Sequence, residues 1–126
     1  GDRTYEDAIG CGIIDGSLNL DGISTTDGLE SLALVWGELS IRDTDLVNVD
    51  GLGQLSAVLG DLNLEDNDDL LNLDGLSSLE SVGGNLKLTR LATLTNLDGL
   101  GVTGMWGELS IEHNDALTNL APFNKG

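Results

Sequence analysis

The chain has 126 residues, 22 of them acidic and 5 basic, which gives a net charge of −17 at pH 7. Nucleic acids and anionic membrane surfaces bind to clustered lysine and arginine, so this charge excludes both as expected partners. No run of residues is apolar over the length that a bilayer requires, so membrane insertion is not expected either.

Residues 1–15 precede the repeated part of the chain and are predicted to form an N-terminal cap. In this segment Tyr5 and Ile9 are expected to point inward, where they would cover the first coil of a stacked structure. Cys11 is the only cysteine, so no disulfide can form within the chain.

Residues 16–119 contain five copies of one pattern, in which a glycine precedes a Leu-x-Leu or Leu-x-Ile pair. The copies start at positions 16, 37, 60, 84 and 107, with steps of 21 to 24 residues. Alternating apolar and polar residues at the start of each copy predict a strand with one buried face. Apolar residues then recur at every third position, which favours short turns and 3₁₀ segments over α-helices.

The length of these copies determines how they can fold. One copy cannot bury its apolar stripe alone, whereas stacked copies cover one another. Leucine dominates the apolar positions, and aromatic residues make up only 3% of the chain. The pattern therefore predicts an all-β fold, a parallel β-solenoid of about five coils around an aliphatic core.

Two further columns recur along the coils. The sequence Asp-Gly-Leu at 27–29, 50–52, 74–76 and 98–100 is expected to place a glycine with positive φ at a corner. An asparagine recurs as Asn48, Asn72, Asn96 and Asn119. We interpret this column as a structural ladder that satisfies turn backbone groups in adjacent coils, with a row of ligand-binding amides as the alternative.

The string WGELSI occurs at residues 36–41 and again at 106–111, three coils later. Its tryptophans, Trp36 and Trp106, stand at a corner of the coil, where the intervening copies have Leu59 and Gly83. They are expected either to pack at this corner or to form exposed apolar contacts for a partner, and packing is favoured.

Residues 120–126 are predicted to form a C-terminal cap or tail. Pro122 cannot donate to a further ladder, and Phe123 is expected to cover the end of the core. The predicted caps are thin, so the solenoid ends, with Tyr5 and Phe123, are candidate contacts with another protein or with further copies of the chain.

The residues that usually carry catalysis are scarce. His113 is the only histidine, and one histidine with one cysteine cannot supply a zinc site. The carboxylates are spread along the coil and are not paired in a cleft. We therefore expect neither an enzyme nor a bound cofactor.

Calcium is the one ion that the turns favour, because closely spaced Asp and Asn oxygens suit a hard cation. The best candidate ligands are Asp66, Asp68 and Asp69 in the turn EDNDD. However, Arg90 stands in the next coil at the position of Asp66, so a regular ladder of calcium sites would be interrupted there. A solvated acidic edge that prevents strand-to-strand pairing is the alternative.

The strings CGIIDGSLNL (11–20), LESVGGNLKL (79–88) and LTNLDGL (94–100) resemble the receptor L-domain family over about residues 11–123. This resemblance implies a right-handed, leucine-rich-repeat-like β-solenoid that is extracellular or at a cell surface and serves recognition or scaffolding. In the receptors the cysteine that corresponds to Cys11 is disulfide-bonded, and this chain has no second cysteine. Cys11 is then expected to be a buried small hydrophobe, with a disulfide to another chain as the alternative.

These observations favour a non-enzymatic extracellular module for protein recognition or adhesion. The alternative is a structural subunit that assembles end to end into filaments or a surface layer, because solenoid ends can stack without closing. Calcium-dependent binding through the acidic turns is a weaker alternative.

Overall fold

The computed structural model describes residues 3–97, 99–100, 104–105 and 107–117, and for residues 104–105 the backbone alone. The predictions for Trp106, Asn119, Phe123 and the cap at 120–126 lie outside the described residues.

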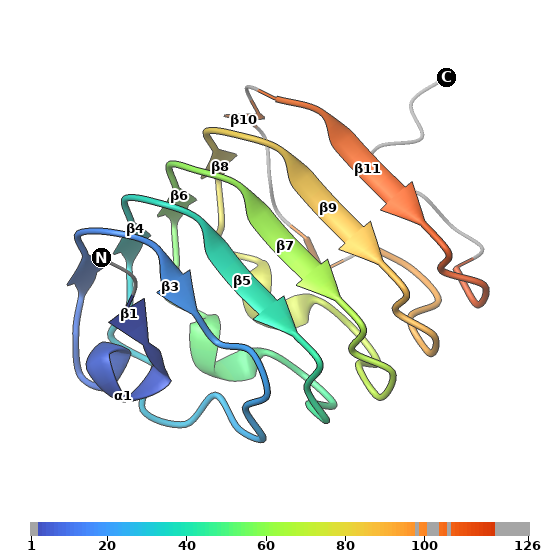
Figure 1. Cartoon of the computed structure of the whole chain (residues 1–126), viewed down its shortest axis with the longest axis horizontal. Helices are drawn as coiled ribbons and strands as arrows, with labels where there is room; N and C mark the ends of the chain where they lie inside the picture. Colours follow the sequence, from blue (N-terminus) through green and yellow to red (C-terminus); the bar gives the residue numbers. More distant parts are fainter. Residues whose placement is uncertain (1–2, 98, 101–103, 106, 118–126) are drawn as a thin grey trace.

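Two parallel sheets run side by side along the molecule (Figure 1). The six strands of the large sheet are, in spatial order, β1 (Arg3–Thr4), β3 (Leu18–Asn19), β5 (Leu39–Arg42), β7 (Leu62–Glu65), β9 (Leu86–Thr89) and β11 (Leu109–Glu112). The five strands of the small sheet are β2 (Ile13–Ile14), β4 (Leu34–Val35), β6 (Ala57–Val58), β8 (Ser81–Val82) and β10 (Gly104–Met105). Successive coils add one strand to each sheet, which confirms the predicted β-solenoid.

The register of the large sheet explains why the Leu-x-Leu pair recurs. Leu39, Leu62 and Leu86 are aligned as direct neighbours on β5, β7 and β9, and each is 0% exposed. Because side chains alternate across a strand, every second residue of each strand enters one continuous interior. Stacking therefore buries a stripe that a single coil would leave in water.

The third side of the coil contains two short 3₁₀ helices, η1 (Asp50–Leu52) and η2 (Asp74–Leu76), as predicted. Their glycines do not have the positive φ that the sequence suggested; in the Asp-Gly-Leu column this conformation occurs at Gly28. Glycine is needed for a different reason. A Cβ on Gly51 would lie 2.1 Å from the Thr26 carbonyl oxygen, and one on Gly75 would lie 2.1 Å from that of Val49. The coils approach too closely there for any side chain.

In the large sheet, a left-handed residue lies at the corner that follows each of the strands β3, β5, β7, β9 and β11. Gly22 occupies this position in the first coil with φ 77°. Asp43, Asp66, Arg90 and His113 follow it in the later coils, with φ between 52° and 58°. This conformation is uncommon for residues other than glycine. The hydrogen-bond ladder nevertheless extends into the turn. The Asp43 and Asp66 N–H groups each donate to a backbone carbonyl of the next coil at 3.1 Å.

At the N-terminal end, helix α1 (Tyr5–Ala8) contacts the first coil. Ala8 is 0% exposed, and the half-buried Tyr5 donates a hydrogen bond from its hydroxyl to the Asp27 carbonyl. Ile9 does not point inward as predicted, because it is 49% exposed. Ala8 and Tyr5 of the helix pack against the core, and so does Cys11, which is partly and not fully buried.

At the other end of the described chain, the core is less completely covered. Leu109 and Ile111 of β11 and the nearby Leu117 are partly exposed, whereas the equivalent leucines of β5, β7 and β9 are fully buried. No helix within the described residues is long and apolar enough to cross a bilayer.

Candidate functional site

An exposed apolar surface lies on the outer face of the small sheet. It consists of Ile13, Leu34, Trp36, Ala57 and Leu59, which we call the small-sheet patch. Ile13 is 59% exposed, Trp36 56% and Leu59 40%, while the other two are half-buried. The patch crosses the first three coils, because Ile13 is aligned with Leu34 and Leu34 with Ala57.

The patch is exposed because its neighbours in the chain must point inward. Val35 and Val58 are 0% exposed, so the residues on either side of them face outward. Trp36 and Leu59 belong to the corner after the strand, where Leu59 donates its backbone N–H to the Val35 carbonyl at 2.9 Å. This placement of Trp36 does not agree with packing at the corner and favours contact with a partner.

The patch ends at the fourth coil for a steric reason. Gly83 takes the position of Trp36 and Leu59 there, and a Cβ on it would lie 2.2 Å from the Leu59 carbonyl oxygen. The aligned strand residue in that coil is Ser81, which replaces Ala57. Among the described residues, the small-sheet patch is therefore confined to the first three coils.

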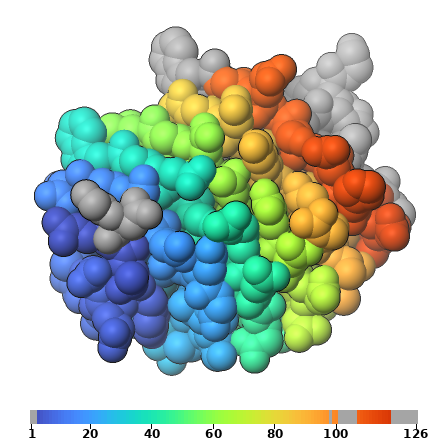
Figure 2. Space-filling model, in the orientation of Figure 1, coloured from blue at the N-terminus to red at the C-terminus, as the bar shows by residue number. Residues whose placement is uncertain are grey.

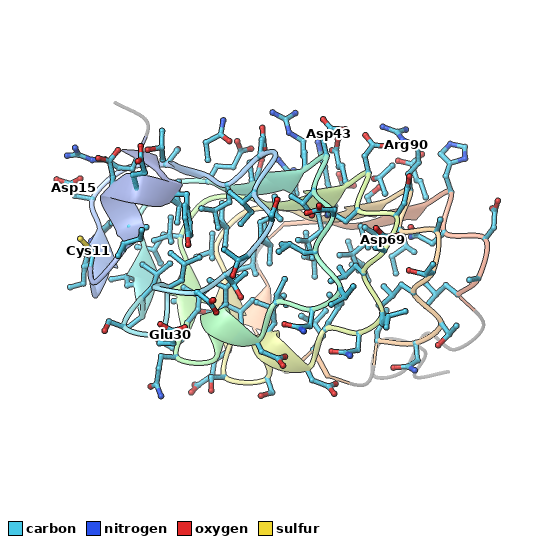
Figure 3. The ribbon with its side chains drawn as sticks, turned by 90° about the horizontal axis from the view of Figure 1, so that it is seen from below. Cys11, Asp15, Glu30, Asp43, Asp69 and Arg90 are labelled. Atoms are coloured by element: carbon cyan, nitrogen blue, oxygen red, sulfur yellow. The ribbon has the colours of Figure 1, made fainter. Side chains whose placement is uncertain are left out.

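The border of the patch is acidic. Asp15 stands at the Trp36 position in the first coil and is joined to Arg3 by an ion pair of 3.1 Å. Glu38 and Asp61 follow Trp36 and Leu59 by two residues, beyond a corner glycine. Figure 3 shows Asp15 and Cys11 at the N-terminal end, and Asp43 and Arg90 along one long edge.

Figure 2 shows the face over the large sheet, where successive coils lie as adjacent bands. The outward residues of this sheet are polar, unlike those of the small-sheet patch. The central column of this face comprises Asn19, Ser40, Asn63, Lys87 and Ser110. Asp21 accepts hydrogen bonds from the Ser40 hydroxyl at 2.8 Å and from the Arg42 guanidinium at 3.1 Å. The bond and the negative charge of Asp21 raise the pKa of Arg42 above its usual value. Asn63 donates to Glu38 at 2.9 Å, and its buried Oδ1 has no partner among the described residues. Several polar side chains of this face are thus hydrogen-bonded to one another, and its central column contains no apolar residue.

The predicted calcium ligands lie at the left-handed corner of the third coil. Asp66 and Asp68 line an open hollow of about 520 Å³ with Arg90, Ala92, His113 and Asp115. The Arg90 guanidinium binds the Asp66 carboxylate, with Nη2 3.1 Å from Oδ2, and these bonds lower the pKa of Asp66. Asp69 is not among the lining residues. Within the described part of the chain, no group of three His, Cys, Asp or Glu side chains is placed to hold a metal ion.

Two asparagines of the predicted column, Asn48 and Asn72, make bonds within their own coil. Asn48 accepts a hydrogen bond from the Asp50 backbone at 3.0 Å, and Asn72 accepts one from the Asp74 backbone at 3.1 Å. Asn96, at the same position in the next coil, is half-buried. These are turn bonds over two residues and do not connect adjacent coils as the sequence suggested.

Asn67 and Asn114, which the sequence analysis did not single out, connect the corners of adjacent coils. Each directly follows a left-handed corner residue, Asp66 or His113. The sequence does indicate these bonds, because Asn67 and Asn114 are polar and stand at the repeat position where the intervening coil has the fully buried Leu91. A buried amide in an apolar column indicates a bond to backbone.

No family model, curated protein or solved structure matches this chain. The resemblance to the receptor L-domain family therefore depends on its motifs between Cys11 and Leu100 and on the solenoid arrangement.

Proposed function

We propose that this protein is a non-enzymatic recognition module that binds another protein through the small-sheet patch. The observation that carries the proposal is the exposure of Trp36, which is 56% open to solvent and is followed at the same position of the next coil by Leu59, 40% exposed. Contiguous exposed apolar surface on a soluble protein marks sites of interaction. Tryptophan is also among the residues that contribute most to binding at such sites.

The scaffold holds this surface in a fixed shape. Val35, Val58 and Val82 are each 0% exposed in the core directly beneath the sheet, so the outward residues cannot rearrange without moving the coil. A surface that is ordered before binding loses less entropy when a partner docks. This supports recognition by a preformed face.

The acidic border indicates the charge of the partner. Asp15 adjoins the patch, and Glu38 and Asp61 follow its corner residues, in a chain of net charge −17, so a partner with basic residues beside an apolar face would be attracted. Such attraction mainly raises the association rate and weakens as salt screens it. The resemblance to receptor L-domains supports an extracellular or cell-surface location for this binding.

The experiment that tests the proposal is a selection of binding peptides from a displayed random library on the immobilised wild-type protein. Trp36→Ser should abolish binding of most selected peptides, because it removes the central apolar side chain. Leu71→Ser is the matched control, since Leu71 is also 56% exposed but lies outside the patch. Both variants should keep their stability within about 0.5 kcal/mol of wild type, as exposed substitutions usually do.

Three outcomes separate the proposal from its alternatives. Selected peptides that lose affinity with Trp36→Ser but not with Leu71→Ser support it. Peptides that are unaffected by Trp36→Ser contradict it, and so does a selection that enriches no binder. The salt dependence of the association rate, measured by surface plasmon resonance, tests the basic character of the partner.

Self-assembly is a second candidate function, favoured by one observation. Leu109 and Ile111 are partly exposed at β11, where equivalent residues in the inner coils are buried. The ladder pattern also directs the Leu109 and Ile111 N–H groups away from β9. Sedimentation velocity from micromolar to millimolar concentration tests this candidate: growing polymers support it, and a constant monomer contradicts it.

A further inference from the structure

The two sheets end differently at the N-terminus of the solenoid (Figure 1). In the large sheet, β1 pairs with β3 and covers its edge. In the small sheet, β2 is the terminal strand, and the described residues contribute no strand beyond it. An open strand edge is a template on which another chain can add a strand.

The hydrogen bonds of β2 show which of its backbone groups remain available. The Gly12 carbonyl accepts from Ala33 at 2.7 Å, and the Ile14 carbonyl accepts from Trp36 at 2.9 Å. In a parallel ladder, alternate residues bond to alternate sides. The N–H and C=O of Ile13, between these two residues, therefore point away from β4 towards the open edge.

A hollow of about 300 Å³ lies beside this edge. It is lined by Arg3, Asp7, Cys11, Ile13, Ile14 and Asp15. Ile13 is 59% exposed and belongs to the small-sheet patch, so the hollow and the patch are continuous. The Arg3–Asp15 ion pair beside it is exposed, with 48% and 74% of the two side chains open to solvent, and such pairs are weakly held.

We propose that β2 accepts an extended segment of a basic partner protein as a sixth strand of the small sheet. This inference rests on the proposed recognition function and specifies how the partner engages. Backbone bonds to Ile13 align the segment, and one of its apolar side chains lies against Ile13 in the patch. Basic residues of the segment face Asp7 and Asp15, because these carboxylates line the hollow of a strongly acidic protein.

The charge of the protein and the shortness of β2 both limit the alternatives. Another copy of this acidic chain would bring like charges to the hollow, which disfavours it as the occupant. A strand of two residues offers few backbone bonds, and short edges are a common protection against unspecific pairing. Affinity therefore depends on the patch as well, which makes the binding selective for apolar, basic segments.

The probe for this proposal is the fluorescein-labelled peptide KVTVTVK. Its apolar valines alternate with polar threonines, as in a strand with one apolar face, and each end carries a basic lysine. Two versions are N-methylated at alternate backbone nitrogens, one on each of the two hydrogen-bonding sides. If the peptide adds to β2, one version should bind about tenfold more weakly or worse, and the other should bind like the parent. Fluorescence polarisation measures all three affinities.

Protein variants and amide exchange locate the peptide. Ile13→Lys should weaken binding about tenfold or more, because it places a positive charge beside the basic peptide and removes the apolar contact. Leu71→Lys, at a position of similar exposure outside the patch, should leave binding unchanged. Exchange of the Ile13 amide, followed by NMR, should slow about tenfold or more when the peptide saturates the protein. Alkylation of Cys11, which lines the hollow, should slow as well.

The proposal is overturned if the peptide fails to bind at millimolar concentration, if both N-methylated versions bind equally, or if Ile13 exchange is unchanged in the complex. These outcomes are separable from the proposed function. Library peptides that depend on Trp36 but tolerate N-methylation would keep the recognition function and exclude strand addition. Strand addition of KVTVTVK without any Trp36-dependent library binder would contradict the patch as the main recognition surface.

Discussion

The Asn67 side-chain amide donates a hydrogen bond to the Ile41 carbonyl of the preceding coil, 3.0 Å away. Its oxygen accepts two bonds from Thr44, one from the hydroxyl at 2.7 Å and one from the backbone N–H at 3.2 Å. Asn67 is only 1% exposed, so these bonds lie out of reach of water. One side chain thus connects its own corner to the end of β5 and to the following turn of the preceding coil.

Asn67→Ala should lower the free energy of unfolding by about 3 kcal/mol. The substitution removes the bond to the Ile41 carbonyl and leaves the buried Thr44 N–H and hydroxyl without their acceptor, and each unsatisfied group costs about 1–3 kcal/mol. Asn48→Ala is the control, because Asn48 is half-buried and makes one turn bond, so its loss should be about 1 kcal/mol. Urea denaturation measures both values. Equal losses for the two variants would show that the bonds between coils carry no special weight.

Gly75→Ala and Gly53→Ala should change stability in opposite directions. A Cβ at Gly75 would meet the Val49 carbonyl oxygen at 2.1 Å, so the coils must separate, with a loss of about 3 kcal/mol or more. Gly53 has φ −62° and ψ −16°, and its nearest atom to a Cβ is 3.4 Å away. Alanine there should raise stability by about 0.4–1 kcal/mol, because it restricts the unfolded chain. Thermal and urea denaturation measure both; destabilisation by Gly53→Ala would contradict this account.

The solenoid could be predicted from sequence because one physical requirement recurs in every coil. Leu39 and Leu62 repeat at a constant place and alternate with polar residues, and only stacking buries such a stripe. The reason for the glycines could not be predicted in the same way. A positive φ and a close approach of coils both select glycine, and only the position of Val49 against Gly75 distinguishes them.

The candidate site was harder to predict than the fold. Trp36 follows the buried Val35, and the sequence alone does not state whether the chain has already turned the corner at this point. Exposure depends on the exact bend, which the structure places directly after β4. The role of Asn67 likewise depends on the distance between corners of neighbouring coils, which no spacing within one coil determines.

Calcium should not raise the thermal midpoint of this protein beyond the effect of sodium chloride at equal ionic strength. The Arg90 guanidinium already binds the Asp66 carboxylate, so a cation would have to displace it. Differential scanning fluorimetry at millimolar calcium tests this expectation, since a specific site stabilises the folded state by mass action. A larger rise that disappears with Asp68→Asn would instead establish the acidic turn as a calcium site.

The ion pair between Arg90 and Asp66 should make stability depend on acid pH. The hydrogen bonds and charge of Arg90 lower the pKa of Asp66 in the folded protein, whereas in the unfolded chain it has its ordinary value near 3.9. The folded state therefore gains stability above that unfolded value and loses it as the pH falls through the lowered, folded pKa. Asp66→Asn should remove this part of the pH dependence, and the difference from wild type should shrink from pH 7 to about pH 2.

The control for this prediction is Asp43→Asn. Asp43 has the same left-handed backbone in the preceding coil, with φ 55° against 56° at Asp66, and asparagine suits this conformation. Among the described residues, the Arg90 guanidinium is bonded to Asp66 and not to Asp43. Urea denaturation across the pH range should show the acid-dependent difference for Asp66→Asn and a smaller one for Asp43→Asn. Similar profiles for the two variants would mean that the general negative charge, and not this pair, determines the acid response.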